Sequence, residues 1–346
     1  MSPYVLMIML FTLGLGTTIT FASTHWLLAW MGLEINTLAI IPLMAQQNHP
    51  RAIEATTKYF MIQATAAATL LFASMINAWL TGQWEISQLN HPLPLIIATI
   101  ALSLKLGLAP MHTWLPDIMQ GLNLNTGLIL ATWQKLAPIS LLLQINNNSY
   151  LLIILGLMSI IVGGWGGLNQ TQLRKLLAYS SIAHLGWMML ALKFLPSLTL
   201  MTLLIYIVMT YSIFNIFKFN KSTNINSLTT AWTKNPALSS ITPLILLSLG
   251  GLPPLTGFLP KWMIIQELTK QHLILVAVTA AMSALLSLYF YLRLSYAMTL
   301  TTSPNTSLNS LPWRLENTSM KSPTAISIIF TTCMLPLSPM IVTTLM

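Results

Sequence analysis

The feature that most limits the fold of this chain is a series of apolar runs, each about twenty residues long and nearly free of charge. A helix of about that length crosses the roughly 30 Å hydrocarbon core of a bilayer. Transmembrane β-strands would instead show alternating segments of about ten residues, and such segments do not occur here. Only 6% of the 346 residues are charged, against about 25% in soluble domains. The sequence therefore predicts an all-α polytopic membrane protein.

Eleven candidate transmembrane spans follow from these runs, joined mostly by short connections. They lie near residues 3–21, 25–45, 58–80, 93–115, 124–145, 150–168, 174–195, 198–218, 239–260, 272–297 and 323–345. The longest connections lie near 219–238 and 298–322, and no soluble domain is inserted. We therefore expect a single membrane domain over residues 1–346.

The basic residues of the loops support an odd number of helices. With eleven crossings, ten cations gather on the side of the N terminus: Arg51, Lys58, Arg174, Lys175, Lys218, Lys221, Lys234, Arg293, Arg314 and Lys321. The opposite side collects Lys193, Lys270 and, if it is a loop residue, Lys261. This positive-inside bias places the N terminus in the compartment of synthesis and the C terminus across the membrane. Loop anchoring accounts for the net charge of +9 without a nucleic-acid partner.

Several cofactor classes find no support in the sequence. The single cysteine, Cys333, excludes an internal disulfide and a cysteine-ligated iron–sulfur cluster. No G-x-G-x-x-G motif follows a strand-like run, so no dinucleotide site is expected. The glycines of residues 163–167 ("GGWGG") have the wrong spacing and are interpreted as a packing or helix-end feature.

Five ionisable residues remain inside or beside the apolar spans: Glu34, Lys105, Lys135, His184 and Lys261. A lysine facing lipid at mid-depth costs roughly 3 kcal/mol, so such groups face the interior and mark an ion or proton path. Other interpretations stay open. The lysines could extend to the headgroups, Glu34 could be a structural acid, His184 a neutral core histidine, and Lys261 a loop residue.

A Gly/Pro-rich segment occurs twice, 144 residues apart. "GLAPMHTWLPD" (107–117) aligns with "GLPPLTGFLPK" (251–261) at five identical positions: Gly107/Gly251, Leu108/Leu252, Pro110/Pro254, Leu115/Leu259 and Pro116/Pro260. Glycine and proline interrupt helices here, and paired interrupted helices indicate a transporter's midplane site. The fourth and ninth spans carry them. An offset of five helices reverses direction, so two inverted repeats are expected, about 1–145 and 150–297, with a final helix about 323–345.

Three long motifs carry a resemblance to a known family. The segments "KLGLAPMHTWLPD", "GGLNQTQLRKLLAYSSIAHLGWM" and "LSLGGLPPLTGFLPKW" resemble the antiporter-like subunits of respiratory complex I, the NADH:ubiquinone oxidoreductase. "THWLLAWMGLEINTLAIIPL" and "TWQKLAPIS" narrow the resemblance to the animal mitochondrial form, over essentially the whole chain.

This resemblance implies a fold of two inverted five-helix bundles with interrupted helices, without three helices found at the start of other members. It implies a place in the proximal membrane arm, in the mitochondrial inner membrane, among core and accessory subunits and phospholipids. The N terminus would face the matrix and the C terminus the intermembrane space. NADH, FMN, iron–sulfur clusters and ubiquinone would be bound by other subunits, with no metal or cofactor in this chain.

The resemblance also assigns residues to proton transfer. Glu34 matches the family's helix-borne glutamate, Lys105 and Lys261 the lysines of the two broken helices, and Lys135 the bridging lysine. Many relatives have histidine at the bridging position, so Lys135 departs from the pattern. His112 and His184 fall in family motifs with less settled roles.

The resulting hypothesis is electrostatic proton transfer through buried water. Separating a Glu34–Lys105 pair would release a proton from Lys105 toward Lys135 and Lys261. Two other functions remain open: a structural subunit that transmits coupling without pumping, and a stand-alone cation/proton antiporter.

Overall fold

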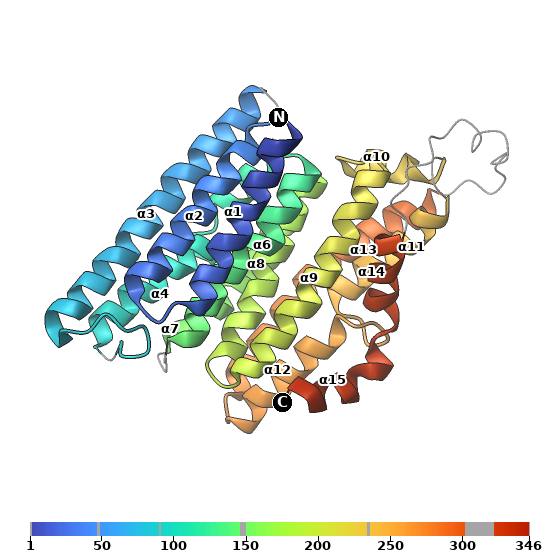
Figure 1. Cartoon of the computed structure of the whole chain (residues 1–346). Helices are drawn as coiled ribbons and strands as arrows, with labels where there is room; N and C mark the ends of the chain where they lie inside the picture. The colour runs from blue at the N-terminus through green and yellow to red at the C-terminus, as the bar shows by residue number, and fades with distance from the viewer. Residues whose placement is uncertain are drawn as a thin grey trace. The chain divides into compact units, whose positions relative to one another are not determined.

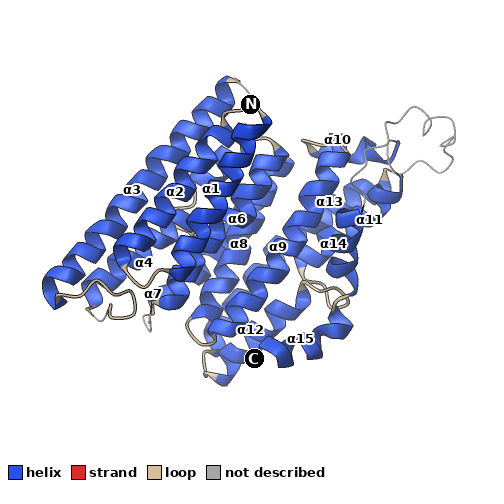
Figure 2. Cartoon of the chain, in the orientation of Figure 1, coloured by secondary structure: helices blue, strands red, loops and turns tan. Residues whose placement is uncertain are grey.

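The computed structural model describes residues 2–46, 49–89, 91–145, 150–233, 236–301 and 322–345. Within these ranges the regular structure is helical, and the only β pairing is two isolated bridges, His25 with Glu85 and Gln172 with Asn224 (Figure 2). The expected all-α class is therefore confirmed for the described part of the chain. Lys234, Arg314 and Lys321, which were counted in the charge bias, lie outside the described residues.

The helices divide between two compact units, Met1–Leu155 and Gly156–Met346 (Figure 1). The first unit contains α1 (Pro3–Ala22), α2 (Trp26–Met44), α3 (Pro50–Thr81), α4 (Pro92–Leu106), α5 (Trp114–Gly121) and α6 (Leu124–Gln144). Helix α7 (Leu151–Gly167) begins in the first unit and continues into the second. The second unit then contains α8 (Leu173–Leu192), α9 (Pro196–Phe219), α10 (Ile225–Thr229), η1 (Thr230–Thr233), α11 (Pro236–Gly250), α12 (Phe258–Lys270), α13 (Ile274–Leu300), α14 (Ser322–Cys333), η4 (Leu335–Leu337) and α15 (Ser338–Leu345).

The expected fourth and ninth spans are each split into two helices. The span 93–115 becomes α4, a connection over 107–113 and α5, and the span 239–260 becomes α11, a connection over 251–257 and α12. The break begins at Gly107 (φ 78°) in one case and at Gly251 (φ 81°) in the other. Glycine adopts this left-handed conformation at little cost, which ends each helix at the expected place.

Six of the described helices are long and apolar enough to cross a membrane by themselves: α1, α2, α3, α6, α9 and α13. Four shorter apolar helices, α4, α7, α11 and α14, coincide with other expected spans. Helix α8 covers the remaining span over 20 residues, with Arg174 and Lys175 in its first turn. Length and composition therefore qualify six of the described helices as candidate crossings, and the expected number of eleven is not established.

The last expected span is not one continuous helix. Over residues 323–345 the chain forms α14, the 3₁₀ turn η4 and α15. Pro336 lies in that turn, and a proline lacks the N–H that a continuing helix requires. The connection expected near 219–238 likewise contains the short helices α10 and η1.

Glycines bring α7 against its neighbours in the second unit. A Cβ at Gly163 would lie 2.7 Å from the backbone nitrogen of Ala183 on α8, and one at Gly167 would lie 2.8 Å from the ring of Phe290 on α13. The "GGWGG" segment forms the last turns of α7, so its interpretation as a packing and helix-end feature is confirmed.

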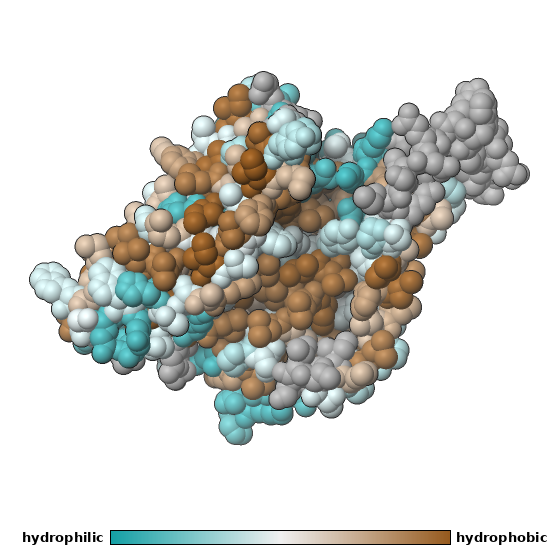
Figure 3. All heavy atoms as spheres, viewed as in Figure 1, coloured by the Kyte–Doolittle hydropathy of each residue, from teal (hydrophilic) through white to brown (hydrophobic). Residues whose placement is uncertain are grey.

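Large apolar side chains remain exposed along the helices, as Figure 3 shows for one face. Trp79 is 89% exposed and Leu275 77% exposed, on α3 and α13 respectively. Water would disfavour such surfaces, whereas hydrocarbon accommodates them, so this distribution agrees with a membrane environment.

Candidate functional site

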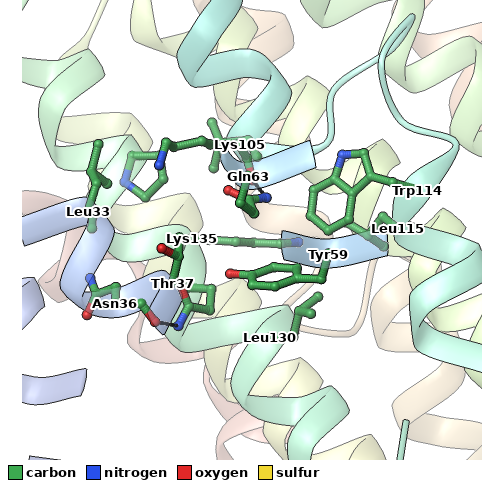
Figure 4. A pocket seen from close by; sticks show the side chains of 14 residues that line it. Leu33, Asn36, Thr37, Tyr59, Gln63, Lys105, Trp114, Leu115, Leu130 and Lys135 are labelled. Atoms are coloured by element: carbon green, nitrogen blue, oxygen red, sulfur yellow. Dashed lines mark hydrogen bonds between the residues drawn. The ribbon is translucent and has the colours of Figure 1, made fainter. Parts of the chain in front are cut away.

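The first unit brings Lys105 and Lys135 to one internal cavity. Lys105 lies on α4 and Lys135 on α6, and both side chains are buried, with 6% and 4% exposure. The cavity has a water-accessible volume of about 20 Å³, and Figure 4 shows side chains from α2 to α6 around it. About 10–15 Å³ of such space holds one water molecule. The two lysines, 30 residues apart in the chain, therefore share a space for about one water.

Lys105 stands at the broken end of α4, where Leu106 is the last helical residue. Within the described residues its ammonium nitrogen is buried without a hydrogen-bond partner. The carboxyl end of a helix carries a partial negative charge, which favours a cation in the last turn. Glu34 acts on Lys105 electrostatically as well. Among the described residues, the helix end and the Glu34 charge therefore act on the Lys105 ammonium without a direct hydrogen bond.

Lys135 lies in the middle of α6, and Pro138 follows it within the same helix. In Figure 4 its side chain extends across the cavity between Gln63 and Tyr59. Since a proline cannot donate a backbone hydrogen bond, Pro138 removes one bond of the α6 ladder next to this lysine.

Glu34, on α2, is partly exposed and is not among the residues that line the cavity. Thr37 donates its hydroxyl to the Glu34 carboxylate at 3.1 Å and to the Glu34 backbone oxygen at 2.8 Å. Among the described residues the salt bridges within 4.0 Å are Lys58–Glu54 and Lys270–Glu267. The expected Glu34–Lys105 pair is therefore not a direct contact in this structure, and its influence acts over a longer range.

Lys261 lies in the second unit, on the first turn of α12, and is 9% exposed. Its ammonium group donates to the carbonyl oxygen of Gly250 at 2.7 Å, at the end of α11. Gly251 lies directly beneath this side chain, because a Cβ there would be 2.9 Å from the Lys261 Cδ. Lys261 thus caps the broken helix α11, and the suggestion of a simple loop lysine is wrong.

The two breaks share one backbone arrangement. The N–H of Gly107 donates to the carbonyls of Ser103 and Leu104, and that of Leu108 donates to Ser103. Adding 144 to each number gives the bonds of the second break, where Gly251 donates to Leu247 and Ser248 and Leu252 donates to Leu247. The repeated sequence thus has the same local structure in both places.

The two histidines occupy different surroundings. His112 lies in the connection between α4 and α5, where its Nδ1 is 3.1 Å from the carbonyl oxygen of Pro110. His184 lies on α8, with its ring centroid 5.6 Å from that of the buried Tyr206. Neither histidine lines the cavity that Lys105 and Lys135 share.

Sequence reasoning missed the neutral polar residues of the cavity. Asn36 and Thr37 on α2, Tyr59 and Gln63 on α3, and Gln134 on α6 all line it. Only ionisable groups stand out in an apolar sequence, whereas amides and hydroxyls cost less to bury and attract less attention. The spacing of four between Tyr59 and Gln63, which places them on one helix face, was the available signal.

The described residues contain no group of three or more His, Cys, Asp or Glu side chains that could hold a metal ion. The chemistry that the site itself offers is proton binding and release by lysine amines.

Comparison with known proteins identifies the family. A family model described as NADH:quinone oxidoreductase/Mrp antiporter, transmembrane, matches residues 23–287, and one described as the NADH dehydrogenase subunit 2 C-terminus matches residues 288–342. Proteins named NADH-ubiquinone oxidoreductase chain 2 from Tetraodon nigroviridis and Salmo salar are 65% and 66% identical to this chain. These alignments cover 99% and 100% of this chain and 99% of each relative.

Solved structures show the same fold. A chain of respiratory complex I from Thermus thermophilus has a TM-score of 0.85 at 28% identity, covering 96% of this chain and 78% of its own. A chain of the Mrp complex from Dietzia has a TM-score of 0.81 at 15% identity, covering 97% of this chain and 76% of its own. At that identity the second likeness concerns the fold alone. From the family models and the full-length relatives together, the chain belongs to the NADH:quinone oxidoreductase/Mrp antiporter family of transmembrane proteins, among the NADH-ubiquinone oxidoreductase chain 2 sequences.

Proposed function

We propose that the chain is a membrane-arm subunit of an H⁺-translocating NADH:ubiquinone oxidoreductase and contributes to proton translocation across the mitochondrial inner membrane. The observation that carries the proposal is the pair of buried lysines, Lys105 and Lys135, at one water-sized cavity beside a broken helix. The chain performs no redox step of its own. NADH, FMN, iron–sulfur clusters and ubiquinone are bound by other subunits.

The proposed step is transfer of a proton from Lys105 to Lys135, followed by transfer toward Lys261. Glu34 controls the first step, because moving or neutralising its charge changes how firmly Lys105 holds a proton. Its partial exposure suits a group that responds to a neighbouring subunit. Lys261 acts as the corresponding group of the second half, at the end of α11.

The electrostatic energy that a charge change at Glu34 can supply is comparable with the work of moving a proton across the membrane. Moving one charge against 100 mV requires about 2.3 kcal/mol. Placing or removing a charge near a buried lysine changes its interaction energy by a few kcal/mol, since the surroundings screen charges poorly. A redistribution of charge at Glu34 is therefore large enough to drive the transfer.

We further propose that the chain crosses the membrane eleven times as two inverted five-helix repeats. The N terminus faces the matrix and the C terminus the intermembrane space. The equal backbone bonds at the breaks after Leu106 and Gly250 support the repeat, and the loop charges support the orientation. Core and accessory subunits and phospholipids cover its apolar surface.

The test is Lys105→Ala and Lys135→Ala in the assembled complex, with NADH-to-ubiquinone turnover and protons pumped per NADH as readouts. Lys58→Ala is the matched control, since this lysine is exposed on α3 and pairs with Glu54. We expect a fall in turnover or pumping for the two buried lysines, with assembly intact, and no change for the control.

Normal turnover and pumping in both buried-lysine variants would overturn the proposal in favour of a structural subunit that only transmits coupling. Cation-dependent proton exchange by the isolated chain, without the redox subunits, would favour a stand-alone antiporter.

A further inference from the structure

One wall of the lysine cavity is the polar face of α3, formed by Tyr59 and Gln63. The two residues are four positions apart, so they are neighbours on the helix surface. Tyr59 is 2% exposed and Gln63 4% exposed, and both line the cavity together with the two lysines. In Figure 4 the Gln63 side chain lies between Lys105 and Lys135.

Gln63 connects this wall to the broken helix. Its Nε2 donates a long hydrogen bond of 3.5 Å to the backbone carbonyl of Lys105. That carbonyl is among the last four of α4, which have no partner within the helix. The bond uses the amide nitrogen, while the amide oxygen has no hydrogen bond to any described residue and is available as an acceptor.

Tyr59 contributes a hydroxyl to the same space. Its ring packs edge-on against Trp114 of α5, with centroids 6.1 Å apart and an interplanar angle of 61°, which fixes the direction of the hydroxyl. No described residue accepts from or donates to this hydroxyl. A phenol oxygen can do both.

A water molecule between the two lysines needs hydrogen-bond acceptors such as the Gln63 oxygen and the Tyr59 hydroxyl. An ammonium group has three donors and no acceptor, whereas a neutral amine can accept one hydrogen bond. A water molecule between a charged Lys105 and a neutral Lys135 therefore accepts from the first and donates to the second, and its other hydrogen still needs an acceptor. A buried water makes about three hydrogen bonds. The Gln63 oxygen and the Tyr59 hydroxyl can each accept a hydrogen bond from this water. The oxygen of the water can in turn accept from the Lys105 ammonium, which has no hydrogen-bond partner among the described residues.

We infer that Gln63 and Tyr59 are positioning residues that hold one water molecule between Lys105 and Lys135 for proton transfer. The water accepts a proton from the Lys105 ammonium and passes one of its own to the neutral Lys135 amine. One N–H bond breaks and one forms, the water is restored, and the positive charge moves from Lys105 to Lys135. This inference rests on the proposed function.

The experiment uses Gln63→Met and Tyr59→Phe in the assembled complex. Methionine keeps the length of the side chain without its polar atoms, and phenylalanine keeps the ring contact with Trp114 and removes one oxygen. We expect each to lower proton-coupled turnover about fivefold, the rate equivalent of about 1 kcal/mol for one hydrogen bond. Gln144→Met is the matched control, because Gln144 also donates to a backbone carbonyl, that of Phe21 at 3.3 Å, and does not line the cavity.

Rescue by a conservative variant separates positioning from packing. Gln63→His keeps a neutral hydrogen-bond acceptor in a side chain of similar size, whereas Gln63→Met has none. We expect Gln63→His to retain more turnover than Gln63→Met, whereas a packing role would make the two variants fall alike.

Unchanged turnover in Gln63→Met and Tyr59→Phe, with losses in Lys105→Ala and Lys135→Ala, would overturn the inference and leave the proposed function standing. Unchanged turnover in all four variants would overturn both. If Gln63→Met reduces assembly, Tyr59→Phe decides the matter, because it removes a single oxygen from an otherwise unaltered ring.

Discussion

Replacing Gly251 with alanine should release Lys261 from the end of α11. The glycine has φ 81°, and a Cβ placed on it would lie 2.9 Å from Cδ, 3.0 Å from Nζ and 3.2 Å from Cε of Lys261. The lysine side chain is flexible and can move away from the new methyl group. Moving lengthens or breaks its 2.7 Å bond to the carbonyl oxygen of Gly250.

Two costs add in this variant. An L-residue in the left-handed region costs about 1–2 kcal/mol. A buried hydrogen bond to a charged group contributes about 1.5–3 kcal/mol. We therefore expect Gly251→Ala to destabilise the folded chain by about 2.5–5 kcal/mol, which is large compared with the usual effect of a single substitution.

Gly82→Ala provides the control for the backbone cost alone. Gly82 has φ 74° at the end of α3, and a Cβ there would meet nothing within 4 Å. Its expected cost is about 1–2 kcal/mol. The difference between the two variants isolates the contribution of Lys261.

The measurement is the thermal midpoint at which the assembled complex loses this subunit, together with NADH-to-ubiquinone turnover below that temperature. We expect Gly251→Ala to lower the midpoint clearly more than Gly82→Ala and to change turnover, whereas Gly82→Ala should leave turnover unaltered. Equal midpoints and normal turnover for both variants would refute the reasoning, since Lys261 would then not depend on its bond to Gly250.

Three further predictions concern the first unit. Glu34→Gln should slow turnover or lower the number of protons pumped per NADH, because it removes the charge that acts on Lys105; unaltered values of both would count against a coupling role. Trp114→Phe should destabilise the chain by about 0.5–1.5 kcal/mol in thermal release of the subunit, because it removes the 3.2 Å bond from the indole nitrogen to the carbonyl oxygen of Leu104; an unchanged midpoint would mean that the N–H of Gly107, which also donates to this carbonyl, satisfies it without the indole. Glu54→Gln should leave the midpoint and turnover unchanged, since its pair with Lys58 is solvent-exposed at both ends; a measurable loss would indicate a partner outside this chain.

The sequence predicts the broken helices well because their cause is local. Gly107 and Gly251 end α4 and α11 through a left-handed conformation that glycine adopts readily, and the repeated Gly/Pro pattern marks both places. The final span was harder to predict because hydropathy does not register a turn. Pro336 interrupts that span although its neighbours are apolar.

Sequence spacing could not show that Lys105 and Lys135 line the same cavity, because this depends on how α4 and α6 pack. The cost of burying charge indicated only that both lysines face the interior. The neutral residues that complete the cavity, Gln63 and Tyr59, carry no such cost. Only the packing of α3 against α4 and α5 reveals them.

The two breaks have the same backbone hydrogen bonds, but different side chains donate to their last carbonyl oxygens. We expect this difference to give the two lysines different roles. At the end of α4, the neutral side chains of Gln63 and Trp114 donate to the carbonyls of Lys105 and Leu104. The Lys105 ammonium is thereby left without a partner among the described residues.

At the end of α11 the ammonium group of Lys261 itself donates to the carbonyl of Gly250. A proton on Lys105 can therefore leave without any helix-end bond being broken. A proton on Lys261 is held by a charge-assisted bond that must lengthen first. On this ground we expect Lys261 to exchange its proton more slowly than Lys105, so substitutions at the Gly250 end should alter the rate of proton release more than the rate of proton entry.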